Sequence, residues 1–151
     1  MVNRVDPAEA IRRLLLILVI AGAIGTTADL ILLEHYEDGW QLVPFAVLGL
    51  AAVSASVCLI APRHAPIQLF RLVMVFVAAG GLLGMWLHYQ GNMEFEREVS
   101  PGLAGSDLFW SAVKGASPPS LAPASLIHLG LLGLASTYRH PSLAKSALKE
   151  E

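Results

Sequence analysis

Histidines and carboxylates recur at the ends of apolar stretches, where they could bind a metal ion or exchange protons. We group six of them as the rim cluster: Glu34, His35, His88, Glu94, Glu96 and Glu98. Imidazole and carboxylate groups are the usual protein ligands of divalent transition metals such as zinc. The rim cluster is therefore a candidate binding site for a cation or for a protein partner.

Two further polar residues, Asp29 and His128, lie inside apolar stretches. An ionisable residue within a membrane span is costly and is by default a candidate functional residue. At 1.5 Å of rise per residue, Asp29 lies about 7 to 8 Å and His128 about 10 Å inside the same boundary. We expect them to form a buried polar pair, with Thr26 or Thr27 as local alternative partners for Asp29.

The composition indicates that these residues belong to a membrane protein. Of 151 residues, 55% are hydrophobic and 15% charged, and the mean hydropathy is +0.60. About 20 mostly apolar residues cross a bilayer as a helix, and four tracts of about this length occur, at about 14–33, 42–61, 69–87 and 121–138. No tract alternates with period two, which disfavours a barrel. The fold class predicted is an all-α integral membrane protein with a four-transmembrane-helix bundle in a single domain, 1–151.

Basic residues predict the orientation of this bundle, because Lys and Arg are retained on the cytoplasmic side. If the four tracts alternate, one side carries Arg4, Arg12, Arg13, Arg63, Arg71, Arg139, Lys145 and Lys149, and the other carries Arg97 and Lys114. Both termini are then cytoplasmic, and we expect a bacterial inner (plasma) membrane. The basic residues form no patch, which argues against nucleic acid as a partner.

The longest connection, about 88–120, is predicted to be an outer loop between the third and fourth spans. Within it, Leu108, Phe109, Ala112 and Val113 share one face of a short helix. Ser106 is a suitable N-cap and Gly115 a suitable stop signal. We expect a short interfacial helix there, with Trp110 near the lipid headgroups.

Two features near the start of the chain and in the second tract limit other interpretations. Arg12, Arg13 and the apolar run after them resemble a secretory signal. The apolar character continues to Leu33, which is longer than a signal requires, so we expect a span. The single cysteine, Cys58, excludes an intramolecular disulfide.

Small residues within the tracts predict where helices pack, because close approach drives association of helices in lipid. Gly80 and Gly84 lie four residues apart in the third tract, on the row that leads to His88. Gly25 precedes Asp29 by the same step, and Gly133 follows His128 in the fourth tract. We expect all four glycines at helix contacts.

The cofactor question stays open among three alternatives. A divalent metal would take its ligands from Glu34, His35, His88, Glu94 and His128, although no H-E-x-x-H spacing supports it. A b-type haem would need His88 and His128 to face each other, and His88 lies too near the rim. A chain without any cofactor is the interpretation we favour.

For function, the sequence favours a non-enzymatic accessory or complex-forming subunit whose acidic, histidine-bearing outer face binds a partner or a cation. Besides the lipid bilayer, the expected partners are another membrane or extracytoplasmic protein, or a second copy of the chain. The alternative is a small oligomeric ion- or proton-coupled transporter that uses Asp29. No nucleophile elbow, H-E-x-x-H or phosphate-binding loop is present to indicate an enzyme.

Overall fold

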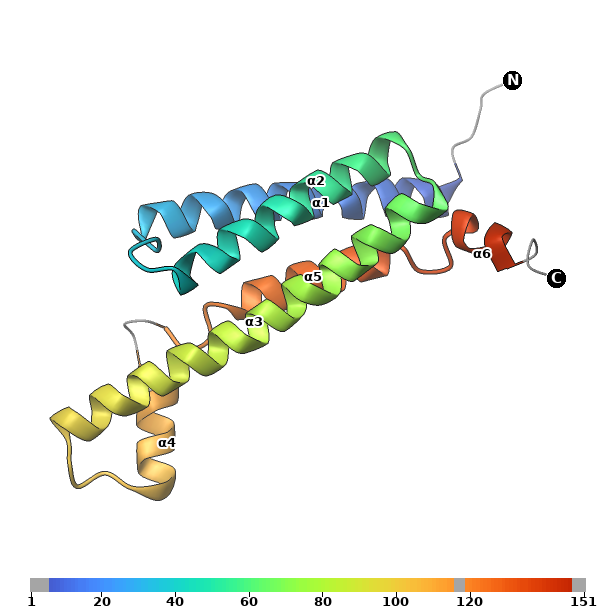
Figure 1. Cartoon of the computed structure of the whole chain (residues 1–151). Coiled ribbons are helices and arrows are strands. Elements are labelled where there is room, and N and C mark those ends of the chain that lie inside the picture. The colour runs from blue at the N-terminus through green and yellow to red at the C-terminus, as the bar shows by residue number, and fades with distance from the viewer. Residues whose placement is uncertain (1–5, 116–118, 148–151) are drawn as a thin grey trace.

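A computed structural model describes residues 6–115 and 119–147 of the chain (Figure 1). These residues form helices and no strand. In chain order the helices are α1 (Pro7–Leu32), the 3₁₀ turn η1 (Trp40–Leu42), α2 (Val43–Ile60), α3 (His64–Val99), α4 (Gly105–Val113), α5 (Ala124–Ser136) and α6 (Pro141–Ala147). Of the predicted inner-side charges, Arg4 and Lys149 lie outside the described residues.

Three helices are long and apolar enough to cross a membrane: Pro7–Leu32, Trp40–Ile60 and His64–Val99. These bounds indicate a membrane protein, as the composition predicts. The predicted fourth span, 121–138, is a helix of only 13 residues, α5. It is about 20 Å long at 1.5 Å per residue, which is less than the roughly 30 Å hydrocarbon thickness. Turns on both sides shorten it, because Pro123 precedes its first residue and Arg139 takes a left-handed conformation (φ 47°) after its end.

The third helix differs from the prediction at its far end. α3 has 36 residues and continues to Val99, twelve residues beyond the predicted end at Leu87. The segment from His88 to Val99 is therefore helix and not loop. Charged residues in that segment do not interrupt an α-helix, since Glu and Arg have high helix propensity. The predicted short helix is present as α4, beginning at Gly105.

α1, α2 and α3 run antiparallel to one another in turn, and α5 runs antiparallel to α3 and contacts both α1 and α3 (Figure 1). We call the end that holds the α1–α2 turn the acidic end, and the end that holds the α2–α3 turn the basic end. Asp38 organises the α1–α2 turn, where its Oδ1 accepts hydrogen bonds from the backbone N–H of Trp40 (2.8 Å) and Gln41 (3.0 Å). These two hydrogen bonds therefore stabilise one backbone conformation of the turn.

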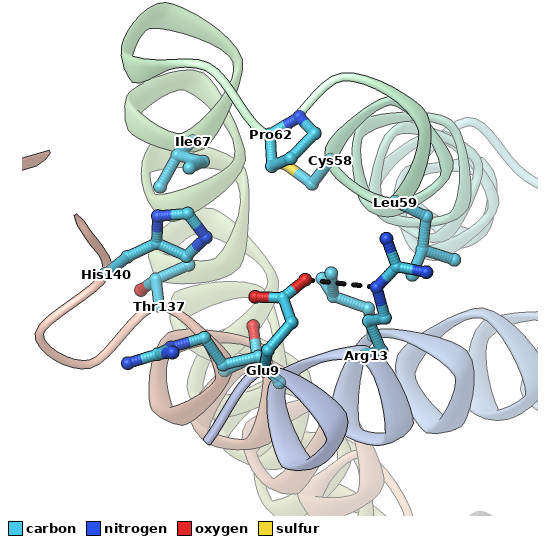
Figure 2. Close-up of a pocket in the computed structure, with 11 residues that line it drawn as sticks. Glu9, Arg13, Cys58, Leu59, Pro62, Ile67, Thr137 and His140 are labelled. Carbon is cyan, nitrogen blue, oxygen red and sulfur yellow. Dashed lines mark hydrogen bonds and ion pairs between the residues drawn. The ribbon is translucent and has the colours of Figure 1, made fainter. Parts of the chain in front are cut away.

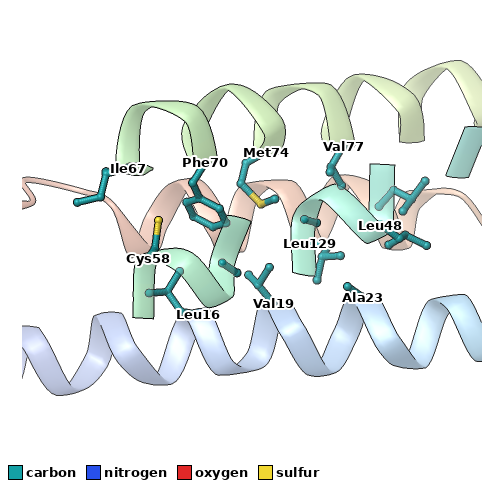
Figure 3. Close-up of a cluster of buried hydrophobic side chains, with 13 residues drawn as sticks. Leu16, Val19, Ala23, Leu48, Cys58, Ile67, Phe70, Met74, Val77 and Leu129 are labelled. Atoms are coloured by element: carbon teal, nitrogen blue, oxygen red, sulfur yellow. The ribbon is translucent and has the colours of Figure 1, made fainter. Parts of the chain in front are cut away.

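The core is mainly apolar (Figure 3), and the buried serines Ser54 of α2 and Ser136 of α5 donate hydrogen bonds to carbonyl oxygens of their own helices. It consists of Leu16, Val19, Ala23, Leu48, Ala51, Ala55, Cys58, Ile67, Phe70, Met74, Val77, Leu126 and Leu129, each at most 8% exposed. Phe70, Met74 and Val77 of α3 are completely buried. These buried side chains extend from the basic end to beyond the middle of the bundle.

Glycines make the contact between α3 and α5 close. A Cβ atom at Gly130 would lie 2.6 Å from the carbonyl oxygen of Met74, and one at Gly84 would lie 2.9 Å from Pro123 Cβ. Gly133 faces Met74 and Phe70 in the same way. Gly84 and Gly133 thus lie at a helix contact, as the sequence predicts. We call this contact the α3–α5 seam.

Gly25 and Gly80 differ from the other two predicted packing glycines. A Cβ atom at either residue would have no described atom within 4 Å. Gly80 borders an open groove between α2 and α3, and Gly25 faces outward on α1. Within the described part of the chain, neither glycine contributes to a helix contact.

Candidate functional site

Asp29 and His128 do not meet in the structure. The side chain of Asp29 is exposed on α1 and makes no hydrogen bond or ion pair with any described residue. His128 is also exposed, and its Nδ1 lies 2.8 Å from the carbonyl oxygen of Ala124, on its own helix. The expected buried pair is therefore absent from this single chain.

The register of α1 against α5 explains this difference. Leu129 Cδ1 lies 2.7 Å from the position of a Cβ atom at Gly22, so the turn of α5 that holds His128 lies level with Gly22. Asp29 is seven residues further along α1, which is about 10 Å at 1.5 Å per residue. The estimate from the sequence takes Leu121 as level with Glu34, whereas the contact of Leu129 with Gly22 shows that α5 begins further from the acidic end than that.

The structure brings two members of the rim cluster together at the acidic end. The rings of His35 and His88 meet edge to face, with centroids 6.2 Å apart. His88 Nδ1 lies 2.9 Å from the carbonyl oxygen of Pro119, which connects α3 to the segment before α5. Burial and, to a smaller extent, the neighbouring His88 lower the pKa of His35, while Asp38 opposes that shift. The α1–α2 turn therefore docks on α3 through an edge-to-face contact between two imidazole rings.

The other members of the rim cluster lie elsewhere. Glu34 is exposed after the end of α1, in a left-handed conformation with φ 54°. Glu94, Glu96 and Glu98 occupy the last turns of α3. Among the described residues, no three His, Cys, Asp or Glu side chains gather as metal ligands would. The geometry therefore gives no support to the metal-binding alternative, for which Glu34, His35, His88, Glu94 and His128 are the candidate ligands.

Asn92 forms a buried polar cluster that the sequence did not reveal. Its Nδ2 donates to Ser120 Oγ (2.8 Å) and to the carbonyl oxygen of Ala112 (3.2 Å). Ser120 Oγ donates to the same carbonyl at 2.8 Å. These bonds fasten α4 and the chain before α5 to the far end of α3. The sequence contains one indication of this contact. Gly81, His88 and Asn92 follow one another at steps of seven and four residues, which puts them on one face of α3.

Aromatic side chains line the surface beside this cluster. Trp86, Tyr89, Phe109 and Trp110 form a continuous series of ring contacts, with centroids 5.2 to 6.0 Å apart. Trp86 and Trp110 are both 55% exposed. Amphipathic aromatic rings of this kind concentrate at the level of lipid headgroups.

The basic end holds a small polar cavity of about 20 Å³ (Figure 2). Arg12 donates from its guanidinium to the carbonyl oxygens of Tyr138 (3.5 Å) and Arg139 (3.3 Å), and Arg13 pairs with Glu9 at 3.0 Å. Arg12 thereby satisfies carbonyl groups just beyond the last turn of α5. A cavity of this size holds about one water molecule and is too small for a larger ligand.

His140 borders the same cavity. Its Nδ1 accepts a hydrogen bond from the backbone N–H of Ser142 at 3.2 Å, so the neutral ring carries its proton on Nε2. Burial, followed by the charge of Arg12, lowers the pKa of His140, and Glu9 partly offsets this effect. The histidine therefore packs at the basic end in its neutral form.

A second hollow, of about 330 Å³, lies between α2 and α3. Its walls are entirely apolar, formed by Val43, Val47, Leu50, Val73, Phe76, Ala79, Gly80 and Leu83. It offers no polar group to fix the orientation of a ligand.

No protein-family model, curated protein or solved structure matches the chain. The functional assignment therefore depends on the geometry described above.

Proposed function

We propose that the protein is a non-enzymatic accessory or complex-forming subunit in a membrane, and that its acidic end binds a partner protein. The observation that carries this proposal is the protruding part of α3 beyond His88 together with α4, which we call the arm. The last turns of α3 continue past Trp86 and Tyr89 and carry mostly exposed side chains, so they are available to contact another molecule. The arm is held in place by the buried Asn92 cluster, which makes it a defined surface.

The arm combines apolar and acidic side chains. Phe95 is 60% and Val99 63% exposed, and both lie among the glutamates of the last turns of α3. Exposed large apolar groups with charged residues around them are typical of protein interaction sites. A partner with a basic rim around an apolar centre would complement this surface.

The transporter alternative has less support. A coupled transporter needs a polar route past its titrating group. The core of this chain is mainly apolar, and Asp29 lies on the outside of α1. A pathway could arise only between several copies, and no described contact favours one.

The proposal includes a placement in the membrane. α1, α2, α3 and the shorter α5 form a four-helix bundle, with α4 as an interfacial helix beside the aromatic series. Arg12, Arg13, Arg63 and Arg139 lie towards the basic end, which supports an orientation with that end and both termini in the cytoplasm of a bacterial cell. The acidic end then faces outward.

Photo-crosslinking in cells tests the partner. A photoreactive amino acid in place of Phe95 should crosslink to one discrete protein, because this side chain lies on the arm. The same amino acid in place of Leu50, exposed on α2 within the bundle, is the matched control. Protein crosslinks from Leu50 and none from Phe95 would overturn the proposal.

Cysteine labelling tests the orientation. Cys58 is buried, and a Cys58→Ala background leaves single introduced cysteines as the targets. A membrane-impermeant maleimide added to intact cells should label Glu98→Cys and not Arg63→Cys, since these exposed residues lie at opposite ends. The reverse pattern would invert the proposed topology.

A further inference from the structure

Asp29 is a polar residue of α1 for which the fold provides no partner. It is the single charged side chain between Arg13 and Glu34. Its side chain is exposed, and no described residue hydrogen-bonds to it. A carboxylate that faces lipid costs several kcal/mol unless it is paired or wetted. The exposed face of α1 is therefore incomplete in the single chain.

The surface around Asp29 permits another helix to approach. Ala21 and Gly25 precede Asp29 at steps of four residues, and Ala28 lies beside them, all exposed. A Cβ atom at Gly25 would have nothing within 4 Å. By contrast, Leu16, Val19 and Ala23 point into the core from the opposite face of α1 (Figure 3). Within the described part of the chain, no contact requires Gly25 to be a glycine.

The charge determines which kind of helix would fit. Two copies of α1 related by a two-fold axis along the membrane normal would place one Asp29 against the other. Two carboxylates at one depth in an apolar medium repel each other. A helix with a basic side chain at that depth would instead form a charge-assisted hydrogen bond to Asp29.

We propose that the α1 face formed by Ala21, Gly25, Ala28 and Asp29 docks a transmembrane helix of a different protein, one that carries a Lys or Arg at the depth of Asp29. This inference rests on the proposed role as a complex-forming subunit and specifies its contact within the membrane. The small residues let the two backbones approach closely, and the basic residue pairs with the carboxylate. The contact is separate from the arm, so each can be tested alone.

A synthetic helix provides a direct test. The full chain, with a donor fluorophore, is placed in lipid nanodiscs, and acceptor-labelled Leu/Ala peptides of about 22 residues are titrated. One peptide has a single Lys at the depth of Asp29, and its control has Leu there. The Lys peptide should bind the wild-type protein about tenfold more tightly than the Leu peptide.

Substitutions in the protein locate the contact. Asp29→Leu should abolish the preference for the Lys peptide. Gly25→Leu should weaken binding of both peptides, because its side chain would hold the backbones apart. Gly49→Leu is the matched control, since Gly49 is also exposed on a long apolar helix with nothing near its Cβ position. Thermal unfolding of each variant shows whether it is folded.

Three results would overturn the inference. They are equal binding of the Lys and Leu peptides, a preference that survives Asp29→Leu, and self-association of the wild-type chain that depends on Asp29. None of them affects crosslinking from Phe95 on the arm. Loss of the crosslink with retention of the peptide preference would instead reject the partner at the acidic end and leave the α1 contact in place.

Discussion

The α3–α5 seam and the outward face of α1 share one sequence pattern and have opposite surroundings. Both contain small residues at steps of three or four. In the seam, Gly130 lies so close to Met74 of α3 that even a methyl group would not fit. On α1, Gly25 has nothing within reach of a Cβ atom. A small-residue pattern therefore marks a surface suited to contact without telling whether the contact lies inside the chain.

The largest expected effect comes from placing the same side chain on both surfaces. Gly130→Leu should lower the free energy of unfolding by about 3 kcal/mol or more, because the backbone of α3 cannot move away from it. Gly25→Leu should change it by less than about 0.5 kcal/mol, as for other exposed sites. Unfolding in a denaturing detergent titration measures both. Similar losses would mean that α1 packs against more of the chain than the structure describes.

Replacing Asn92 of α3 and replacing Asp29 of α1 should also have different effects on local stability. Asn92→Leu removes the donor to Ala112 and Ser120 and should cost about 1 to 3 kcal/mol of local stability. Hydrogen exchange of the α4 amides should become faster, while exchange in α1 and α2 stays unchanged. Asp29→Leu should leave exchange unaltered in the isolated chain. Protection of α4 that survives Asn92→Leu would show that the cluster does not hold the arm.

At the basic end, two consecutive arginines of α1 have different contacts. Arg12 hydrogen-bonds to the chain that follows α5, whereas Arg13 pairs with Glu9 on its own helix. Arg12→Gln should cost about 1 kcal/mol, because the guanidinium hydrogen-bonds to two carbonyl groups after α5. Arg13→Gln should cost less than about 0.5 kcal/mol, since its ion pair with Glu9 is exposed. Thermal unfolding in detergent compares them, and equal losses would assign the Arg12 effect to charge alone.

The smallest effect on stability is expected from a change in pH. It involves His35 at the acidic end and His140 at the basic end, and not the α3–α5 seam. Burial lowers the pKa of His35 and His140 below the ordinary value of 6.5. The unfolded chain then takes up protons before the folded one does. The contribution of each histidine is present above about pH 6.5 and is lost as the pH falls through 6.5 towards the folded pKa. Unfolding midpoints measured from pH 7.5 to 5 should decrease.

Replacing these histidines provides the control for the pH effect. His35→Asn with His140→Asn should flatten the dependence, whereas Gly25→Leu should leave it unchanged. If the double variant keeps the full dependence, other groups titrate in that range.

Sequence reasoning recovered the features that depend on composition and local pattern. The long apolar helices, the short helix α4 and the packing roles of Gly84 and Gly133 follow from residue type and spacing. The depth of His128 did not follow, because it depends on where the turn at 121–123 gives way to α5. Hydropathy does not predict the continuation of α3 through its glutamates, because charged residues end an apolar tract without ending the helix.

Other parts of the candidate site depend on contacts between distant residues. The bonds of Asn92 to Ala112 and Ser120 join positions 20 and 28 residues apart, and no local pattern specifies them. Arg12 reaches residues more than 120 positions away. The exposure of Asp29 could not be predicted, since helical spacing shows which residues share a face and not which face points inward.

The length of α3 determines how far the arm extends. From His88 to Val99 the helix adds about 16 Å at 1.5 Å per residue, so the tip of the arm stands up to that height above the aromatic series. For the partner proposed above, this length sets the height above the bilayer at which its binding surface would meet the arm. Removing one turn would lower the tip by about 5.4 Å, and removing two residues would rotate Phe95 to the other side. The number of residues that follow His88 in α3 thus determines both how far the arm extends and which way Phe95 points.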